Sequence, residues 1–313
     1  MSVPITLIVD DGAPVNLMYG HELGVGHELL VPNAFTREFA DVCRRHGVRG
    51  KFSVVPMPLA LGRIDERLSR VPPPQLRGFL DIVRRHIAPT FDITPEILTH
   101  FRAMDLATGR FLHLFEDEWV ARAGVSDMTD YISLALRILR NVELPATGVT
   151  SPWATGRGNE KAYAQAIADA FWRVHRRKFC WYFLHSLGNR PPRRPWIGWQ
   201  DKRSGRVAVT VPANTPDVFW EAQYPPSRRA ARAAAIKGVD SLLSSNGRGG
   251  RVRELFDGGF PIVLLTHWQS LFSNGRAAGL WGLACLLERI DETFADDVTW
   301  VRCSDLARQA LRK

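Results

Sequence analysis

Short apolar segments alternate with amphipathic segments along most of the chain. The apolar segments are rich in β-branched and aromatic residues, which predicts buried strands. The predicted strands are Ile5–Val9, Arg49–Met57, Phe91–His100, Gly148–Trp153, Phe179–Leu184, Arg206–Pro212, Pro261–Thr266 and Val298–Cys303. The amphipathic segments predict helices over Ala34–His46, Gln75–His86, Asp130–Asn141, Glu160–Arg173, 227–245 and Ala277–Phe294, and Ser304 caps a terminal helix.

Strands that alternate with helices predict an α/β fold, a parallel α/β barrel or a distorted relative of one with seven or eight strands. Three long segments lack both patterns. Residues 13–32 and 101–128 are predicted as a polar loop and as irregular or partly helical chain, and residues 186–206 as a surface loop. No internal repeat or low-complexity linker interrupts residues 1–313, so we expect a single domain.

The composition is that of an ordinary globular protein. The chain has 313 residues, of which 45% are hydrophobic and 23% charged, enough for a large core. No apolar run has the length of a membrane span, and the N-terminus lacks the basic segment of a signal peptide. The four cysteines lie far apart, which favours neither disulfides nor a zinc ribbon. We therefore expect a cytoplasmic protein without membrane contact.

The formal charge of +9 comes mostly from clustered arginines. Such clusters are compatible with nucleic-acid binding, with a solvated face or with a site that attracts an anionic substrate. They are not interleaved with aromatic residues, as a groove that stacks bases would require. Nucleic acid is therefore not the expected partner.

The end of the first strand is the first candidate for chemistry. Asp10 and Asp11 follow the apolar run directly, and Gly12 comes next. Burial of unpaired carboxylates is costly, so the two aspartates should lie at the carboxyl edge of the sheet, where α/β folds place their active sites. Gly12 would let the backbone turn and would leave room for a ligand. The alternative is a solvated turn.

Three more predicted strands end at a histidine, namely His100, His185 and His267. The ends of parallel strands meet at one edge of a barrel, so these imidazoles can join the aspartates there. Carboxylates and imidazoles bind zinc or a similar divalent metal, which lowers the pKa of a bound water, and the second aspartate can serve as the base. The alternative is that each histidine only forms structural hydrogen bonds.

Several motifs, in order along the chain, resemble those of the polysaccharide deacetylase (NodB homology) superfamily. They are Asp10-Asp11-Gly12, Gly47 to Ser53, Thr99-His100, Ser151-Pro152-Trp153 and Leu264-Leu265-Thr266-His267. The resemblance spans most of the chain, although each motif is degenerate. It implies an irregular (β/α) barrel and the metal-dependent removal of an acetyl group from a sugar.

The resemblance also implies roles for individual residues. Asp10 matches the catalytic base, Asp11 and His100 match metal ligands, and His267 matches the histidine that acts as general acid. Two positions depart from the family. The second metal histidine would fall at position 104, which is Met, and the possible substitutes are His21, His27, Asp105 and His113. The arginine that would orient the base is also absent, because Ser151 begins the stretch that should contain it.

Ten tryptophans are available to stack on sugar rings, and at least half of them should be core residues. Trp153 and Trp268 follow predicted strands and are the expected substrate-binding residues, while Trp196 and Trp199 lie in the predicted surface loop.

Three functions from different classes remain open. The first is a metal-dependent hydrolase that removes an acetyl group from an acetylated sugar or glycan precursor. The second is a barrel that binds glycans without catalysis, which the missing histidine motivates. The third is a glycoside hydrolase that pairs Asp10 with Glu96 or Glu118. All three predict a carbohydrate partner, and none determines the oligomeric state.

Overall fold

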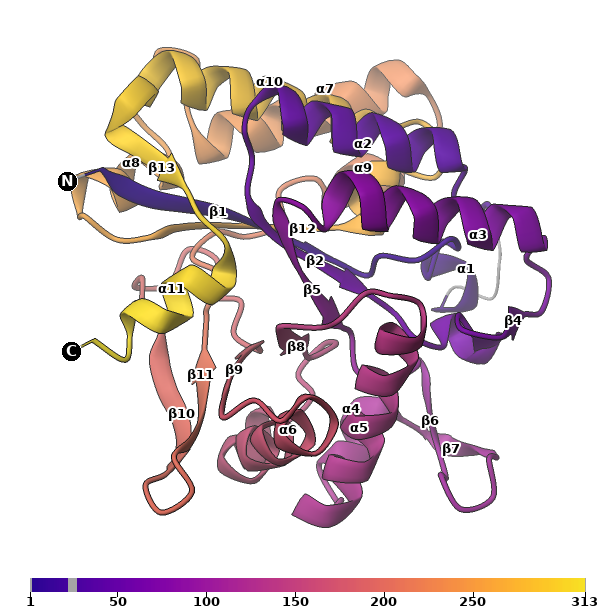
Figure 1. Ribbon diagram of the computed structural model, residues 1–313. Helices are drawn as coiled ribbons and strands as arrows, with labels where there is room; N and C mark the ends of the chain where they lie inside the picture. The colour runs from indigo at the N-terminus through magenta and orange to yellow at the C-terminus, as the bar shows by residue number, and fades with distance from the viewer. Residues whose placement is uncertain (1, 22–26, 313) are drawn as a thin grey trace.

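The computed structural model describes the chain except residues 1, 22–26 and 313 (Figure 1). Its larger sheet runs through the middle of the molecule and contains parallel strands in the order β12, β1, β2, β5, with β13 paired to the first half of β1. Their bounds are β1 Val3–Asp10, β2 Gly50–Val54, β5 Phe91–Pro95, β12 Ile262–His267 and β13 Val298–Trp300. Every position of β2 and β5 is buried, as expected for a parallel sheet covered on both faces.

A second sheet has the strand order β10, β11, β9, β8. Strands β8, β9 and β11 are parallel, whereas β10 is antiparallel to β11. The bounds are β8 Gly148–Thr150, β9 Phe179–Phe183, β10 Trp196–Asp201 and β11 Arg206–Thr210. Strand β10 corrects the prediction of a loop over 186–206. It is a partly exposed edge strand with a bulge at Ile197–Trp199, so its pattern lacks the continuous apolar run of a buried strand.

Two seams join the sheets. At the first seam, the backbone N–H of Ile97 donates to the carbonyl oxygen of Thr150 (3.1 Å), and the backbone N–H of Thr147 donates to the carbonyl oxygen of Ile93 (2.9 Å). At the second seam, the backbone N–H of Asn214 donates to the carbonyl oxygen of Val263 on β12 (3.1 Å). The fold is therefore mixed α/β with parallel strands in barrel-like succession. In the described part of the chain, no continuous ladder closes these strands into the predicted barrel.

Helices flank the sheets (Figure 1), with α2, α3, α7 and α10 beside the larger sheet and α5 and α6 beside the smaller one. The helices are α1 Met18–His21, α2 Asn33–Arg45, α3 Pro73–Ile82, α4 Glu116–Val120, α5 Val125–Asn141, α6 Glu160–His175, α7 Arg228–Leu242, α8 Arg251–Asp257, α9 Trp268–Phe272, α10 Ala278–Phe294 and α11 Cys303–Gln309. A π-helical turn, η2 Val83–Ile87, extends α3, and the 3-10 turns are η1 Pro58–Ala60, η3 Arg157–Asn159, η4 Trp220–Gln223 and η5 Ala295–Asp297. Among the described residues, no helix has the length and apolar composition to cross a bilayer.

Two small hairpins complete the fold, β3 Gly62–Arg63 with β4 Arg67–Leu68, and β6 Arg102–Met104 with β7 Phe111–Phe115. The second hairpin projects from the body of the molecule (Figure 1). It lies in a segment predicted to be irregular. Four of the five residues of its β7 strand are apolar, but none of the five is buried, so the strand is not part of the covered sheets that the pattern predicts.

Trp268 is a core residue. Its ring is buried against those of Phe35, Phe39 and Phe52, with centroids 4.9 to 5.4 Å away, and its indole N–H donates to the carbonyl of Ala13 (3.0 Å). This placement contradicts the prediction that Trp268 binds substrate. The indole lies in α9, directly after β12, and that helix turns it into the core between α2 and the sheet.

Candidate functional site

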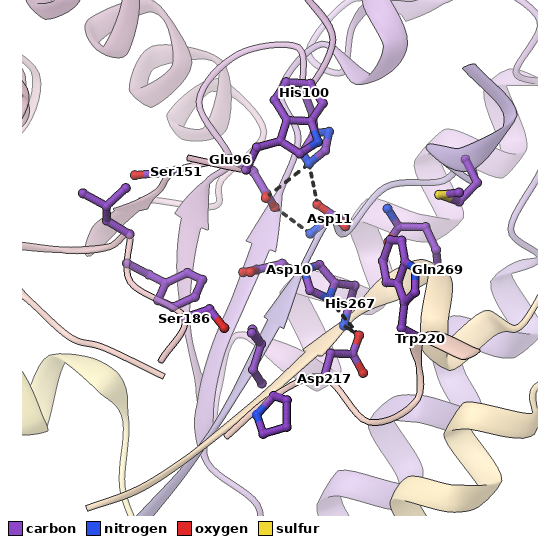
Figure 2. Close-up of a pocket in the computed structure, with 16 residues that line it drawn as sticks. Asp10, Asp11, Glu96, His100, Ser151, Ser186, Asp217, Trp220, His267 and Gln269 are labelled. Carbon is purple, nitrogen blue, oxygen red and sulfur yellow. Dashed lines mark hydrogen bonds and ion pairs between the residues drawn. The ribbon is translucent and has the colours of Figure 1, made fainter. Parts of the chain in front are cut away.

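A cavity of about 590 Å³ opens at the carboxyl ends of β1 and β12 and of the strands across the seam (Figure 2). Five of the six predicted site residues line it, namely Asp10, Asp11, His100, Trp153 and His267. They come from different parts of the chain because parallel strands bring their carboxyl ends to one edge. The other lining residues include Glu96, Ser151, Phe183, Ser186, Asp217, Trp220 and Gln269.

Asp11, Glu96 and His100 form a buried cluster on one side of this cavity. Nε2 of His100 lies 2.9 Å from Oδ1 of Asp11 and 3.6 Å from Oε1 of Glu96. One ligand atom from each of the three residues lies within 4.8 Å of the others. In the part of the chain that the structure describes, this is the one such group of three potential metal ligands.

Glu96 was not among the expected metal ligands. The third strand was predicted to run to His100, but β5 ends at Pro95, and Glu96 follows at the seam with Thr150. Glu96 precedes His100 by four residues. Two potential ligands are therefore four residues apart, as in the family that the motifs resemble, but here the partner of His100 is a carboxylate on its N-terminal side. Its Oε2 accepts hydrogen bonds from the backbone N–H of Asp11 (2.6 Å) and from the hydroxyl of Ser53.

The backbone around the cluster is strained. Asp11 has φ 67°, His100 has φ 49° and Trp153 has φ 49°, a region that non-glycine residues rarely adopt. The turn after β1 therefore falls on Asp11, not on Gly12 as predicted. Gly12 is needed for another reason, since a Cβ there would come within 2.1 Å of the carbonyl oxygen of Ser53.

A second buried carboxylate holds the backbone of the His100 loop. Oε1 of Glu116 accepts the N–H groups of Leu98 (3.2 Å) and Thr99 (2.8 Å), and its Oε2 accepts that of His100 (2.9 Å). The hydroxyl of Tyr131 also donates to Glu116 (2.8 Å). These four bonds fix the loop that presents His100 to the cavity.

The cluster favours a cation. Burial lowers the pKa of His100, but the carboxylates of Asp11 and Glu96 outweigh this effect and raise that pKa to about 9. Burial raises the pKa of Asp11, yet His100 brings it well below its usual range. Burial and the charges of Asp11 and Asp10 raise the pKa of Glu96 well above its usual range. The unlike charges of this cluster hold its side chains together, and two carboxylates with one imidazole within 4.8 Å of one another are a donor set that fits a divalent metal ion.

Asp10 is paired with a lysine. The ammonium of Lys51, on β2, donates to Oδ1 of Asp10, and the lysine side chain is fully buried. The ammonium nitrogen of Lys51 also lies 5.3 Å from the ring centre of Phe183. Burial raises the pKa of Asp10, and the ammonium of Lys51 only partly offsets this. Lys51 is thus the cation that contacts Asp10 in a chain that lacks the expected arginine.

His267 lies beside Asp10 and is held by a third aspartate. The two residues are register partners on β12 and β1. Nδ1 of His267 lies 2.8 Å from Oδ2 of Asp217, which also accepts the backbone N–H of His267 (3.1 Å). Burial lowers the pKa of His267, whereas the hydrogen bond to Asp217 and the charge of Asp11 raise it, to about 10. The imidazole is therefore protonated at neutral pH, and Trp220 packs against its ring at 5.2 Å.

Three of the suggested substitutes for the missing histidine, Asp105, His113 and His27, do not line this cavity. Met104 and Asp105 line a separate hollow beside the β6–β7 hairpin, and His113 is exposed on β7. His27 does not line the cavity. The side chain of His21 lies outside the described residues. His185, the remaining histidine at a strand end, pairs with Glu160 on α6, with 3.0 Å between Nε2 and each carboxylate oxygen.

Four residues of the site were not predicted in the positions that the structure gives them, although Glu96 was considered as a partner of Asp10, and two of the four had a weak local signal. Lys51 is a charge inside an apolar strand, and Glu96 follows a buried strand directly. Glu116 and Asp217 lie in segments without a clear pattern. Only the first two could have been selected by the principle that buried charges need partners.

No protein-family model matches the chain, and no curated protein matches it. Two solved structures are similar in shape, both of mutants of BA3943, a CE4 family pseudoenzyme, the second described as having restored enzymatic activity. They are 8% and 9% identical to this chain, with TM-scores of 0.43 and 0.42. The alignments cover 98% of this chain and 67% and 68% of those chains. Because both scores are low, the interpretation of the site rests on its own geometry.

Proposed function

We propose that this protein is a metal-dependent hydrolase that removes an acetyl group from an acetylated sugar or glycan precursor. One observation supports this proposal above all others. A buried cluster of potential metal ligands shares a cavity with an anchored carboxylate, Asp10, and an anchored imidazolium, His267. A metal site, a base and an acid together can catalyse the hydrolysis of an amide or an ester.

Asp11, Glu96 and His100 are the proposed ligands of the metal, and zinc is the predicted ion. When bound, a divalent cation supplies Lewis-acid polarisation of an acyl oxygen and acidifies water. Glu96 takes the place of the second histidine in this proposal. Two carboxylates and one imidazole leave the site with more negative charge than two imidazoles and one carboxylate would.

Asp10 is the proposed base. Lys51 holds one oxygen of its carboxylate, which leaves the other to accept a proton from the attacking water. Burial raises the pKa of Asp10 and so increases its basicity toward that water. Lys51 would keep the carboxylate oriented, as the absent arginine would in the family that the motifs resemble.

His267 is the proposed acid. With Nδ1 engaged by Asp217, Nε2 is the nitrogen available to the cavity, and the ring enters the reaction with both nitrogens protonated. As the bond from the acyl carbon to the sugar nitrogen or oxygen breaks, Nε2 gives its proton to the leaving group. The products are acetate and the free amine or hydroxyl. Trp153 and Trp220, at the rim, are the proposed contacts of the sugar.

The test is acetate release from acetylated amino sugars by the protein loaded with zinc or cobalt. Asp10→Asn should lower kcat by about 100-fold or more while the metal content stays the same, because it removes the base and spares the proposed ligands. His267→Ala should give a loss of similar size per folded molecule.

Three outcomes would contradict the proposal. An unchanged rate in Asp10→Asn would exclude this residue as the base. Purified protein with less than about one ion per chain, and no gain on addition of zinc, would favour the glycan-binding alternative without catalysis. Release of sugar that persists after treatment with a chelator would favour the glycoside hydrolase that pairs Asp10 with a second carboxylate.

A further inference from the structure

The wall of the cavity contains a buried glutamine, Gln269, that no step of the proposed function uses. Its side chain reaches from α9 into the cavity (Figure 2), although the residue is only 3% exposed. Its amide oxygen is buried and has no hydrogen-bond partner among the described residues. The amide nitrogen is therefore the polar end of this side chain that faces the cavity. Buried polar groups nearly always have a partner, so an amide left in this state at a site indicates a ligand.

The position of Gln269 is fixed relative to His267, the proposed acid. The two residues are separated by Trp268, whose ring is buried in the core. The hydroxyl of Ser270 accepts the backbone N–H of His267 (3.2 Å), and the carbonyl of Gln269 accepts the N–H of Ser273 (2.8 Å). The amide therefore needs no rearrangement of the backbone to meet a group that His267 also reaches, which is the condition for preorganised stabilisation of charge.

The cavity has many acceptors and few available donors. Four carboxylates line it, those of Asp10, Asp11, Glu96 and Asp217. Two neutral donors of the lining are engaged elsewhere, because the hydroxyl of Ser151 donates to Tyr163 (3.1 Å) and the indole of Trp220 donates to Tyr224 (3.1 Å). An oxygen that becomes negatively charged here is repelled by the carboxylates and needs an N–H donor. The amide nitrogen of Gln269 offers one without adding charge to the site.

We propose that the amide nitrogen of Gln269 donates a hydrogen bond to the acyl oxygen of the substrate and stabilises the negative charge that this oxygen gains during hydrolysis. This inference rests on the proposed function and deepens it, because it assigns a further catalytic residue to the same cavity.

The charge on the acyl oxygen exists only between two steps. When water adds to the acyl carbon, a C–O bond forms, one proton of the water passes to Asp10, and the electron pair of the double bond moves to the acyl oxygen. When the double bond forms again, the bond to the sugar nitrogen or oxygen breaks, and the leaving group takes the proton of His267. Acetic acid ionises, and Asp10 and His267 recover their original states by proton exchange with solvent. A donor to this oxygen therefore lowers the barrier more than it strengthens substrate binding.

The test replaces Gln269 with Met, an apolar side chain of similar length that lacks the donor, in the full-length, metal-loaded protein. Gln269→Met should lower kcat for acetate release by about 100-fold per folded molecule, while KM stays within about threefold and the metal content is unchanged. Gln223→Met is the matched control. Gln223 is also buried and its amide nitrogen also lacks a partner among the described residues, but it does not line the cavity.

A second readout does not depend on turnover. The probe is a phosphonate in place of the acetyl group of N-acetylglucosamine, because its anionic, tetrahedral oxygens resemble the charged acyl oxygen. Gln269→Met should weaken its binding by about tenfold or more, measured by calorimetry. In protein that carries Asp10→Asn to prevent turnover, the same substitution should change the affinity for N-acetylglucosamine by less than about threefold.

The outcomes separate this inference from the proposed function. If the parent releases acetate and Gln269→Met changes neither kcat nor the affinity for the phosphonate, the role of Gln269 is wrong and the hydrolase stands. A higher KM with unchanged kcat would assign the amide to recognition of the sugar and would also overturn the inference. If the parent releases no acetate, the hydrolase fails, and the phosphonate decides separately. Weaker binding by Gln269→Met then supports the donor, and equal binding refutes it.

Discussion

At the scale of single residues, the most informative pair is Lys51 and Asp10. A lysine inside an apolar strand loses its hydration, and Lys51 is fully buried. Asp10 supplies the opposite charge at the end of the neighbouring strand. Removal of one partner leaves the other buried without compensation, which costs more than the pair itself contributes.

We therefore expect Lys51→Met to destabilise the protein by about 3 kcal/mol or more, because the carboxylate of Asp10 loses the cation that it contacts. The double variant Lys51→Met with Asp10→Asn should be destabilised by less than the sum of the two single variants. Urea unfolding of all four proteins measures this coupling.

Lys161→Met is the control for the loss of a lysine as such, since Lys161 is exposed on α6. It should change stability by less than about 0.5 kcal/mol. Additive effects of the two single substitutions at Lys51 and Asp10 would mean that the ion pair does not stabilise the fold.

At the scale of elements, the first turn of α4 determines how the His100 loop is presented. The loop between β5 and β6 contains residues with positive φ, Ile97 at 25° and His100 at 49°. Such a backbone persists only when its surroundings hold it. Glu116 does so, because its carboxylate accepts three consecutive N–H groups of that loop.

Glu116→Gln should weaken metal binding by roughly 10- to 100-fold, because the amide replaces one accepting oxygen with a donor and disturbs the position of His100. Titration of the purified protein with cobalt, followed by its absorption spectrum, gives the affinity. Thermal unfolding of the metal-free variant, measured separately, shows how much of the loss in metal affinity comes from a less stable fold.

Tyr131→Phe is the matched control. It removes the hydroxyl that donates to Glu116 but keeps the three backbone bonds, so metal affinity should fall much less than in Glu116→Gln. Equal affinity of Glu116→Gln and the parent protein would show that the loop holds its shape without this carboxylate. No metal binding by the parent would instead count against the metal site itself.

At the scale of the whole molecule, the pH dependence of folding has an identifiable contribution from His175, at the end of α6. Burial, together with the charges of Arg177 and Arg140, lowers the pKa of His175 from 6.5 to about 4. Its ring packs on Phe171 at 5.6 Å, and its Nε2 has no hydrogen-bond partner among the described residues.

The unfolded chain therefore takes up this proton near its ordinary pKa of 6.5, whereas the folded chain takes it up only near pH 4. Because the unfolded state binds more protons in between, stability falls as the pH falls through this window. His175→Phe should lose less stability than the parent when urea unfolding is compared at about pH 7 and about pH 5. His113→Phe, which changes an exposed histidine, should follow the parent, and an identical pH dependence for His175→Phe would refute the assignment.

The strands of the two sheets, β10 excepted, follow from the sequence, because a strand buried on both faces is apolar along most of its length. The segments predicted around β1, β2, β9 and β12 match the observed strands to within a few residues. The partly exposed strands β10 and β7 were not predicted, because neither belongs to the buried parallel strands on which the prediction was based. The same reasoning placed Asp10, Asp11 and His267 at strand ends, and all three line one cavity.

Tertiary structure alone decided which side chains meet there. Trp268 and Trp153 both follow apolar segments in the sequence, yet one turns into the core and the other lies exposed at the rim. Likewise, Lys51 and Glu96 become part of the site only through contacts with the end of β1, 41 and 85 positions away in the chain. Local sequence determined where most strands form, because the run of apolar residues that predicts a strand is a property of neighbouring positions. The pairing of charges depends on how the strands align in space, and only the folded chain sets that alignment.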